Sequence, residues 1–345
     1  MATNASAREY NIIVGKQDVS ELAIGGDNDI ADADFVSGSR LFMRNATMTG
    51  INYDNAFTTS EVLRTGRRSL EDGDLIRHYG SGSWTFDFDY LVENEVMAQT
   101  LLSLATGIAD VSTSAQITAA VANTKEDLSD GATAADNVGI VLLEAPATAS
   151  GLSGDDHCMH SAVLQNLTMA VDAGTDGGRM HMSGQFMSGY KPLVADHGVT
   201  GATTASNYER GLFDCNTITV GGHAVTCRAF SVTISNPATR VGFKSGTGEA
   251  DGYLRGGLFD ITGTITVKYD ADTADALTDW KANTAYAIAV KNTDTGSGEV
   301  FDFAIPNARM IGHNIDFSDE GLFVEIPFRA TTGDGTGDLA TIKFS

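Results

Sequence analysis

The sequence predicts a mainly β protein with two tandem β-sandwich or barrel domains, each carrying one flanking α-helix and one long loop. Three observations predict this class. Apolar and polar residues alternate in several strand-sized stretches, the 38 glycines far outnumber the 5 prolines, and much of the first half recurs in order in the second half. Many Gly, Thr, Ser and Asp residues are typical of short strands joined by turns.

The alternation is clearest in the stretch FDITGTITVKYD (259–270). Its odd positions are apolar or glycine, and its even positions are polar, which is the period-two pattern of a half-buried strand. We expect Ile265, Val267 and Tyr269 to face the core. A similar stretch, WTFDFDY (84–90), places aromatic side chains on one side of a strand and Asp on the other.

The strongest internal match is gapless. Residues 35–52, FVSGSRLFMRNATMTGIN, lie over residues 219–236, TVGGHAVTCRAFSVTISN, and both read as a glycine-turned hairpin whose second strand ends at Asn. Identical pairs in this match include Gly38 with Gly222, Arg44 with Arg228, Thr49 with Thr233, and Asn52 with Asn236.

The matches continue in the same order. A loop at 63–75 resembles 239–254, the two alternating strands follow, and each is followed by a helical pattern. The first helix, at 93–107, has Gly107 to end it, and the second, at 270–283, has Asp272 or Thr273 to cap its start. Pro327 cannot donate a ladder hydrogen bond, so we expect its strand at a sheet edge or beside a bulge.

These matches divide the chain into two similar units. The predicted organisation is an N-terminal arm (1–29), a first domain (30–195) with an insertion near 108–137, a linker (196–212), a second domain (213–333) and a C-terminal arm (334–345).

The formal net charge of −23 argues against a role as an adhesive DNA-binding protein. Three explanations fit this charge: solubility, a high-salt habitat, or a surface that must not bind DNA passing nearby. The charge alone does not distinguish them. The first ten residues lack the pattern of a signal peptide, and no apolar window reaches the ~18–20 residues that a membrane span needs. Without an export signal, Cys215 and Cys227, which could flank a hairpin and pair, are expected to be reduced.

Candidate chemistry is sparse. The stretch DDHCMH places His157, Cys158 and His160 near one another, but their spacing matches no zinc pattern, and a polar loop entering a strand explains them. A calcium loop at 270–281 would need Gly and Glu where Asp275 and Lys281 stand. The glycine-rich stretches lack the lysine of a phosphate loop. The sequence therefore predicts no cofactor, no metal and no enzyme, and favours a structural or assembly role.

The repeated unit resembles the tail tube (major tail) proteins of long-tailed phages. The second copy is the closer match, through RAFSVTISNPATRVG, GGLFDITGTITVKYDADTADAL and IPNARMIGHNIDFSDEGLFVEIPFRATTG. The resemblance implies domains that form six-fold rings, with strands closing an inner β-barrel around a lumen, and rings that stack into the tube through which the genome is ejected. Two tube domains per chain would let three chains close a pseudo-six-fold ring.

The resemblance also implies partners and sites. The chain would bind copies of itself, enclose the tape-measure protein and double-stranded DNA, and meet tail terminator and distal tail proteins at the tube ends, with no membrane. It would be a virion protein assembled in the host cytoplasm. Candidate lumen-facing residues are Asp87, Asp89, Thr264, Thr266 and Lys268, although the same face could be solvated exterior. Candidate ring-contact residues in the long loops are Arg64, Arg67, Arg68, Asp72, Arg240, Lys244 and Asp251.

Two alternatives remain open from the sequence. One is another virion or surface-layer protein built from paired β-sandwiches, which would share the duplication and the acidity. The other is a metal-dependent, β-rich hydrolase that uses the DDHCMH stretch.

Overall fold

A computed structural model gives the fold of most of the chain. It describes residues 10–18, 30–43, 46–53, 57–59, 75–77, 84–109, 111–112, 115–118, 121, 126–127, 138–145, 156–190, 192–195, 197, 199, 215–242, 250–292, 301–318, 321–333 and 335–344.

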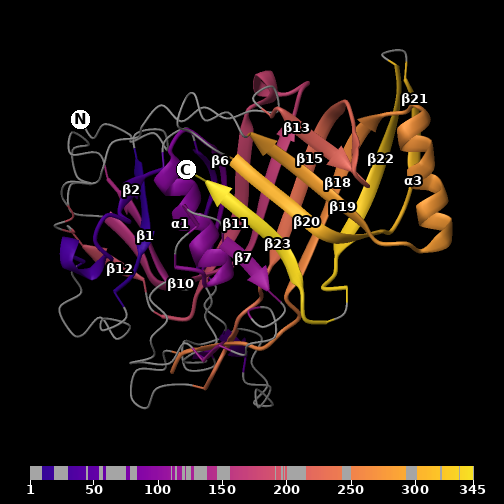
Figure 1. Ribbon diagram of the computed structural model, residues 1–345. Coiled ribbons are helices and arrows are strands. Elements are labelled where there is room, and N and C mark those ends of the chain that lie inside the picture. Colours follow the sequence, from indigo (N-terminus) through magenta and orange to yellow (C-terminus); the bar gives the residue numbers. More distant parts are fainter. Residues whose placement is uncertain are drawn as a thin grey trace, which may run out of the picture.

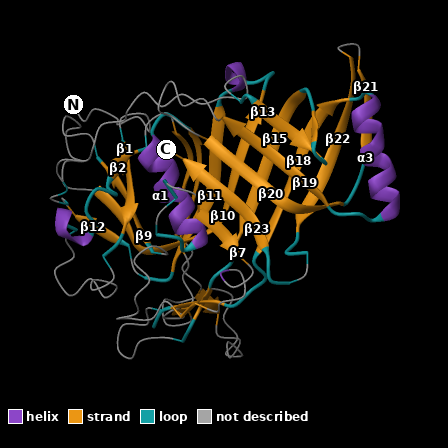
Figure 2. Cartoon of the chain, in the orientation of Figure 1, coloured by secondary structure: helices purple, strands orange, loops and turns teal. Residues whose placement is uncertain are grey.

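Strands dominate these residues (Figure 2). The first part of the chain forms β1 (Asn11–Lys16), β2 (Leu41–Phe42), β3 (Ala46–Tyr53), β4 (Phe57–Thr59), β5 (Leu75–Arg77), β6 (Trp84–Leu91), β7 (Ala115–Thr118), β8 (Glu126–Asp127), β9 (Gly139–Glu144), β10 (Asp156–Asp172), β11 (Met180–Ser188) and β12 (Leu193–Ala195). The second part forms β13 (Thr217–Val220), β14 (His223–Ala224), β15 (Cys227–Ser235), β16 (Thr239–Arg240), β17 (Tyr253–Arg255), β18 (Asp260–Lys268), β19 (Tyr286–Asn292), β20 (Phe301–Met310), β21 (Asn314–Ser318), β22 (Gly321–Ala330) and β23 (Asp338–Phe344). The helices are α1 (Glu95–Thr106) and α3 (Ala271–Ala282), with 3-10 turns at Asp32–Asp34 and Asp176–Gly178.

The same antiparallel pairings occur in both parts of the chain. In the first part the strands run in the order β2, β1, β9, β10, β11, β6, β3. In the second part they run in the order β14, β13, β19, β20, β22, β18, β15. In addition, β12 pairs with the start of β10, and β23 pairs with the start of β20. Figure 1 shows the second set beside the first.

The long strand β10 belongs to two sheets. Its first residues pair with β9 and β12, whereas its later residues pair with β11 and β15. The change falls at an irregularity between Met159 and Ala162, where Ser161 has a φ of 47°. In the second part, two strands take the place of the long strand β10. Both β20 and β21 pair with β22, as β10 pairs with β11.

The break between β20 and β21 lies opposite Pro327. The Ile311 backbone N–H donates to the Pro327 carbonyl at 2.9 Å, but Pro327 has no N–H to return the bond. The strand that holds Pro327 lies between β18 and the β20–β21 pair, so it is not an edge. The expectation of a sheet edge was therefore wrong, and the pairing of β22 shows no bulge at Pro327; the partner strand is divided opposite it instead.

One hydrophobic core joins both parts of the chain. Ile265 and Val267 are fully buried in it, as predicted, and Tyr269 packs against it half-buried. In the second part the core lies between β15 and β20, where the rings of Phe230 and Phe303 are 5.3 Å apart. The small sheet of β2, β1, β9 and β12 is apolar on both faces, because its other face forms a second cluster.

Both helices begin and end at recognisable caps. Asn94 Oδ1 accepts from the N–H groups of Val96 and Met97 at 2.8 and 3.2 Å, and Gly107, at φ 77°, ends α1 as predicted. The start of α3 differs from the prediction of Asp272 or Thr273. Asp270 Oδ1 accepts from the Thr273 N–H at 3.2 Å, and Thr273 Oγ1 accepts from the Asp270 N–H at 2.7 Å, which is a reciprocal cap.

Both predicted terminal arms contain sheet strands. β1 pairs with β9 and buries Ile13, and β23 pairs with β20 and buries Phe344. The predicted insertion supplies β7, which pairs with β23, and β8, which pairs with β17. β7 and β8 are short, and their partners lie far away in sequence. Local patterning in the sequence therefore gave no sign of them.

A substitution at Gly263 tests how tightly the core face of β18 is packed. A Cβ at this position would overlap the Ser231 carbonyl oxygen and lie 2.6 Å from Phe328 Cζ. We expect Gly263→Ala to lower the free energy of unfolding by about 2 kcal/mol, because backbone and a packed ring cannot both move aside. Urea unfolding measures this. Gly256→Ala, whose Cβ would meet only Leu254 side-chain atoms at 3.4 Å, is the matched control. Equal stability of the two variants would contradict the packing described here.

Candidate functional site: a polar sheet face and its two free edges

Eight strands form one continuous antiparallel sheet across both parts of the chain. Their order is β3, β6, β11, β10, β15, β18, β22, β21. One face of this sheet packs on the core through residues such as Phe86, Val232 and Ile326. Because successive side chains alternate between faces, the residues between them form a second, solvent-facing surface, which we call the polar face.

The middle of the polar face is lined by small hydroxyl side chains. One register row crosses the sheet through Thr47, Asp89, Ser183, Thr168, Thr233, Thr262 and Arg329. The next row crosses it through Leu91, His181, Ala170, Ser231, Thr264 and Pro327. Hydroxyl groups can form hydrogen bonds with water without carrying charge, so the centre of the polar face is polar but neutral.

All five predicted lumen residues lie on this polar face. Asp87 and Asp89 alternate with the buried rings of β6, and Thr264, Thr266 and Lys268 alternate with the buried residues of β18. The structure therefore brings the two predicted groups onto one surface.

Several charges on this face are paired. Gln185 Nε2 donates to Asp87 Oδ1 at 2.7 Å. His181 lies between Asp89 and Asp176, with its ring nitrogens 3.2 and 2.9 Å from their carboxylate oxygens. Arg329 Nε and Asp260 Oδ1 are 2.7 Å apart at the other end of the face.

The two parts of the sheet meet where β10 pairs with β15. Seven residue pairs, Asn166–Asp172 against Ser235–Ala229, form this ladder. On the polar face the hydroxyls of Thr168 and Thr233 are 2.8 Å apart, which links the two strands through side chains as well. We call this ladder and the contacts around it the internal junction.

Two residues from the second part bind the C-terminal end of α1 at the internal junction. Arg255, 3% exposed, donates from Nη2 to the Leu104 carbonyl at 3.0 Å, and from Nη1 to the carbonyls of Leu164 and Asn236. Asn236 Nδ2 donates to the Ala105 carbonyl at 3.1 Å. The last carbonyls of a helix have no partner in the helix and carry partial negative charge, so a cation and an amide are suited to this place.

Tyr253 fixes the same loop to the first part of the chain. Its hydroxyl donates to the Ser161 carbonyl at 2.8 Å and accepts from the Gly189 N–H at 2.7 Å. Burial raises the pKa of Tyr253 to about 12, so the hydroxyl keeps its proton at neutral pH and can donate.

The eight-strand sheet ends in two free edges. β3 pairs with β6, and β21 pairs with β22; within the described ranges no other strand pairs with either. Near the β21 edge, Phe317 is 82% exposed and Ile311 is 61% exposed. Phe317 lies on the same side of β21 as Ile315, which packs against the core. Large exposed apolar residues beside an unpaired strand are typical of an interaction surface.

The predicted ring-contact residues are only partly described. Arg64, Arg67, Arg68, Asp72 and Lys244 lie outside the described residues. Asp251 is exposed just before β17. Arg240 lies against Gly189 of the first part, since a Cβ on Gly189 would be 2.8 Å from its Nε, and desolvation lowers the pKa of Arg240.

The weak metal candidates do not share one site. His157 and Cys158 are neighbours in β10 and so point to opposite faces, with Cys158 inside an apolar cluster. His160 packs on Tyr190, with ring centroids 5.3 Å apart. Within the described part of the chain, no group of three His, Cys, Asp or Glu residues could hold a metal ion. Burial raises the pKa of the Cys227 thiol to about 12, and no disulfide joins it to Cys215.

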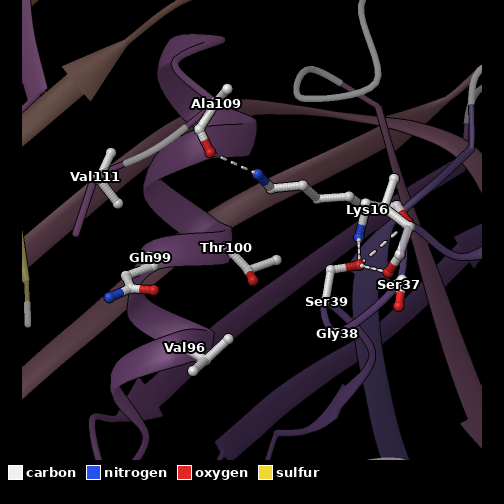
Figure 3. Close-up of a pocket in the computed structure, with 10 residues that line it drawn as sticks. Lys16, Ser37, Gly38, Ser39, Val96, Gln99, Thr100, Ala109 and Val111 are labelled. Carbon is white, nitrogen blue, oxygen red and sulfur yellow. Dashed lines mark hydrogen bonds between the residues drawn. The ribbon is translucent and has the colours of Figure 1, made fainter. Parts of the chain in front are cut away.

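A hollow of about 170 Å³ lies between α1, the end of β1 and the Gly38 turn (Figure 3). Lys16 crosses it and donates from Nζ to the Ala109 carbonyl at 3.2 Å. Ser39 Oγ accepts from the Lys16 N–H at 3.0 Å and donates to the Val36 carbonyl at 2.8 Å. These bonds hold the turn and the residues after α1 in place.

The family comparison agrees with the fold. The phage tail tube protein family matches residues 15–342. The chain belongs to this family and is a structural tail tube protein, a virion component that assembles with itself into a tube. A comparison with curated proteins finds no match. Among the described residues, no helix is long and apolar enough to cross a membrane.

Arg255 gives a test of the internal junction. We expect Arg255→Met to lower the free energy of unfolding by about 3 kcal/mol, because the change leaves buried carbonyls of both parts of the chain without their donor. Arg329→Met is the control. It breaks an ion pair in which Arg329 is 45% exposed, so its loss should stay below about 1 kcal/mol. Similar losses in the two variants, measured by urea unfolding, would show that Arg255 does not join the halves.

Proposed function

We propose that the chain contains two copies of a tube domain and that three chains close a pseudo-six-fold ring of the tail tube. The observation that carries this proposal is the recurrence of one set of strand pairings in the two parts of the chain. The internal junction then corresponds to one domain–domain contact of the ring, made within a single chain.

The two free edges are the counterparts of the two strands at the internal junction. β3 holds the place of β15, because each is the last strand of its set. β21 and the end of β20 hold the place of the later part of β10, because each pairs with the equivalent strand, β22 or β11. A β21 edge that pairs with β3 of the next chain would therefore repeat the β10–β15 ladder. Such a contact is heterologous, and a ring of them leaves no open edge.

The polar face would line the lumen. Its neutral hydroxyl strip offers double-stranded DNA few cations to bind, and the net charge of −23 adds repulsion at long range. The opposite assignment, with this face as solvated exterior, would place the core-covering elements inside.

The remaining roles rest on the family resemblance. Stacked rings would enclose the tape-measure protein and then the DNA that is ejected, and the tube ends would meet terminator and distal tail proteins. Assembly would take place in the host cytoplasm. A different virion or surface-layer role would give two-dimensional lattices in place of tubes, and electron microscopy of the purified protein separates the two.

Phe317 tests whether the β21 edge joins chains. We expect Phe317→Asp to leave the unassembled chain as stable as the parent, because Phe317 is exposed there. The same change should raise the concentration needed for assembly at least tenfold, since burying a Phe contributes about 2 kcal/mol and each 1.4 kcal/mol is a factor of ten.

Leu258→Asp is the control for the Phe317 variant. Leu258 is 67% exposed but lies in the loop before β18, away from β21. Sedimentation against concentration measures assembly. If the Phe317 variant assembles at the parent concentration, the β21 edge does not form the contact between chains.

The lumen assignment has its own test at Thr264 and Thr266. Replacing both by Lys should leave tubes intact, because both sites are partly exposed on the polar face, but should make the tube retain DNA. Glu at the same two sites keeps a long side chain and reverses the charge, so it should not retain DNA. DNA release from particles that carry each variant is the measurement. Indistinguishable release in the two variants would place this face outside the lumen.

A further inference from the structure

One row of neighbouring residues relates the two parts of the sheet position by position. In the first part the row runs through Asn52, Thr85, Met187 and Val163, and in the second part through Ser231, Thr264, Pro327 and Ile311. The rows correspond because Thr85 and Thr264 are each the second residue of the alternating stretches 84–90 and 263–269. The irregularities of β3 and β15 also coincide, since they fall beside Asp87 and Thr266, the next polar positions of β6 and β18. Ile311 therefore takes the place of Val163.

Phe317 of β21 takes the place of Met169 of β10. A second pair of rows shows this, through Asp87, Gln185 and Asn166 in the first part and through Thr266, Glu325 and Asn314 in the second. Phe317 lies three residues after Asn314, as Met169 lies three residues after Asn166.

These equivalent positions differ in exposure. Val163 and Met169 are 0% and 1% exposed, whereas Ile311 and Phe317 are 61% and 82% exposed. The second part of the chain buries the two residues of β10, because Met169 lies in the ladder with β15 and Val163 packs in one cluster with Tyr253 of β17. Among the described residues, no strand takes the part of β15 or β17 beside β21.

The first part of the chain carries the matching elements at its own free edge. β3 takes the place of β15, and the β4–β5 pair takes the place of the β16–β17 pair, since each pair lies between those strands and the long strand β6 or β18. β8 extends the β16–β17 pair, whereas β4 and β5 form a sheet of two strands within the described ranges. A two-stranded pair alone is only marginally stable in water, so a further contact would stabilise it.

We propose that a second copy of this chain pairs its β3 with β21 in the register of the internal junction, and that its β4–β5 pair covers Ile311. The inference rests on the proposed ring. In the internal junction Ala170 pairs with Ser231. Ser318, the residue after Phe317, takes the place of Ala170. Asn52 takes the place of Ser231, so Ser318 of one chain lies opposite Asn52 of its neighbour.

Disulfide cross-linking reads this register directly. In Ser318→Cys/Asn52→Cys the two thiols come within disulfide reach, because opposite residues of an antiparallel pair have Cα atoms about 5 Å apart. The assembled variant is oxidised in air with copper phenanthroline. We expect covalent dimers and trimers on a non-reducing gel and nothing larger, since three contacts close the ring. The two single variants control for the native cysteines.

Ser318→Cys/Thr47→Cys is the matched control. The gapless sequence match places Thr47 over Ser231, but Thr47 lies about 16 Å from Asn52 along an extended strand. We expect no cross-link in this variant, and cross-linking of the control alone would overturn the register. Tubes that cross-link in neither variant would overturn the contact. A parent chain that never forms tubes would instead overturn the proposed function, and this contact with it.

Ile311 gives a test that needs no cysteine. Ile311→Asp should leave the urea midpoint of the unassembled chain at the parent value, because the side chain is already largely exposed. It should raise the concentration for half-assembly about tenfold, since it removes an apolar side chain from the contact between chains. Leu258→Asp is again the control. The proposed cover of Ile311 is overturned if the variant assembles at the parent concentration, or if its urea midpoint falls.

Discussion

Between β10 and β15, a ladder of seven residue pairs makes one sheet out of two parts of the chain. The order of the eight-strand sheet, the core that both parts share and the position of α1 all depend on it. The ladder is supported on the polar face by the Thr168–Thr233 hydroxyl contact and on the other side by Arg255, which is buried against three backbone carbonyls. A buried cation that donates to these main-chain oxygens fixes the distance between a helix end and two strands.

The same ladder explains why the outer edges remain open. A strand at the edge of a sheet carries unpaired N–H and C=O groups, and proteins usually cover or charge such edges. Here, one edge carries Phe317 and Ile311 in exposed positions, and α3 lies beside it. These features are unfavourable for an isolated chain in water, but they suit a chain whose edge is completed by a copy of itself. Covalent linkage of two domains would also make half of the ring contacts intramolecular, which raises their effective concentration.

Much of the fold was predictable because its signals are local. The alternation at 259–270 and 84–90, the cap at Gly107 and the order of strand, helix and hairpin all arise within short windows, and the predicted lumen residues fell on one face because strand alternation is strict. The placement of β1 and β23 was missed, because their partners lie far away in sequence and only that pairing brings the predicted arms into the sheets.

The role of Arg255 was missed for the same reason. Its partners lie on α1 and β10, far away in sequence, and a single arginine after Tyr-Leu carries no motif. Asn236 did leave a signal, since it ends the gapless match with Asn52, although the alignment gave no hint of the helix end that it binds. The reciprocal cap of Asp270 and Thr273 was visible in the sequence, but neighbouring Asp272 offered an equally plausible start.

The most direct test is a high-resolution electron microscopy reconstruction of tubes assembled from the purified chain. The account predicts three chains per ring, β21 of each chain paired with β3 of the next, and the Thr168–Thr233 row facing the lumen. Rings in which β3 and β21 stay unpaired, or in which that row faces the outside, would contradict it.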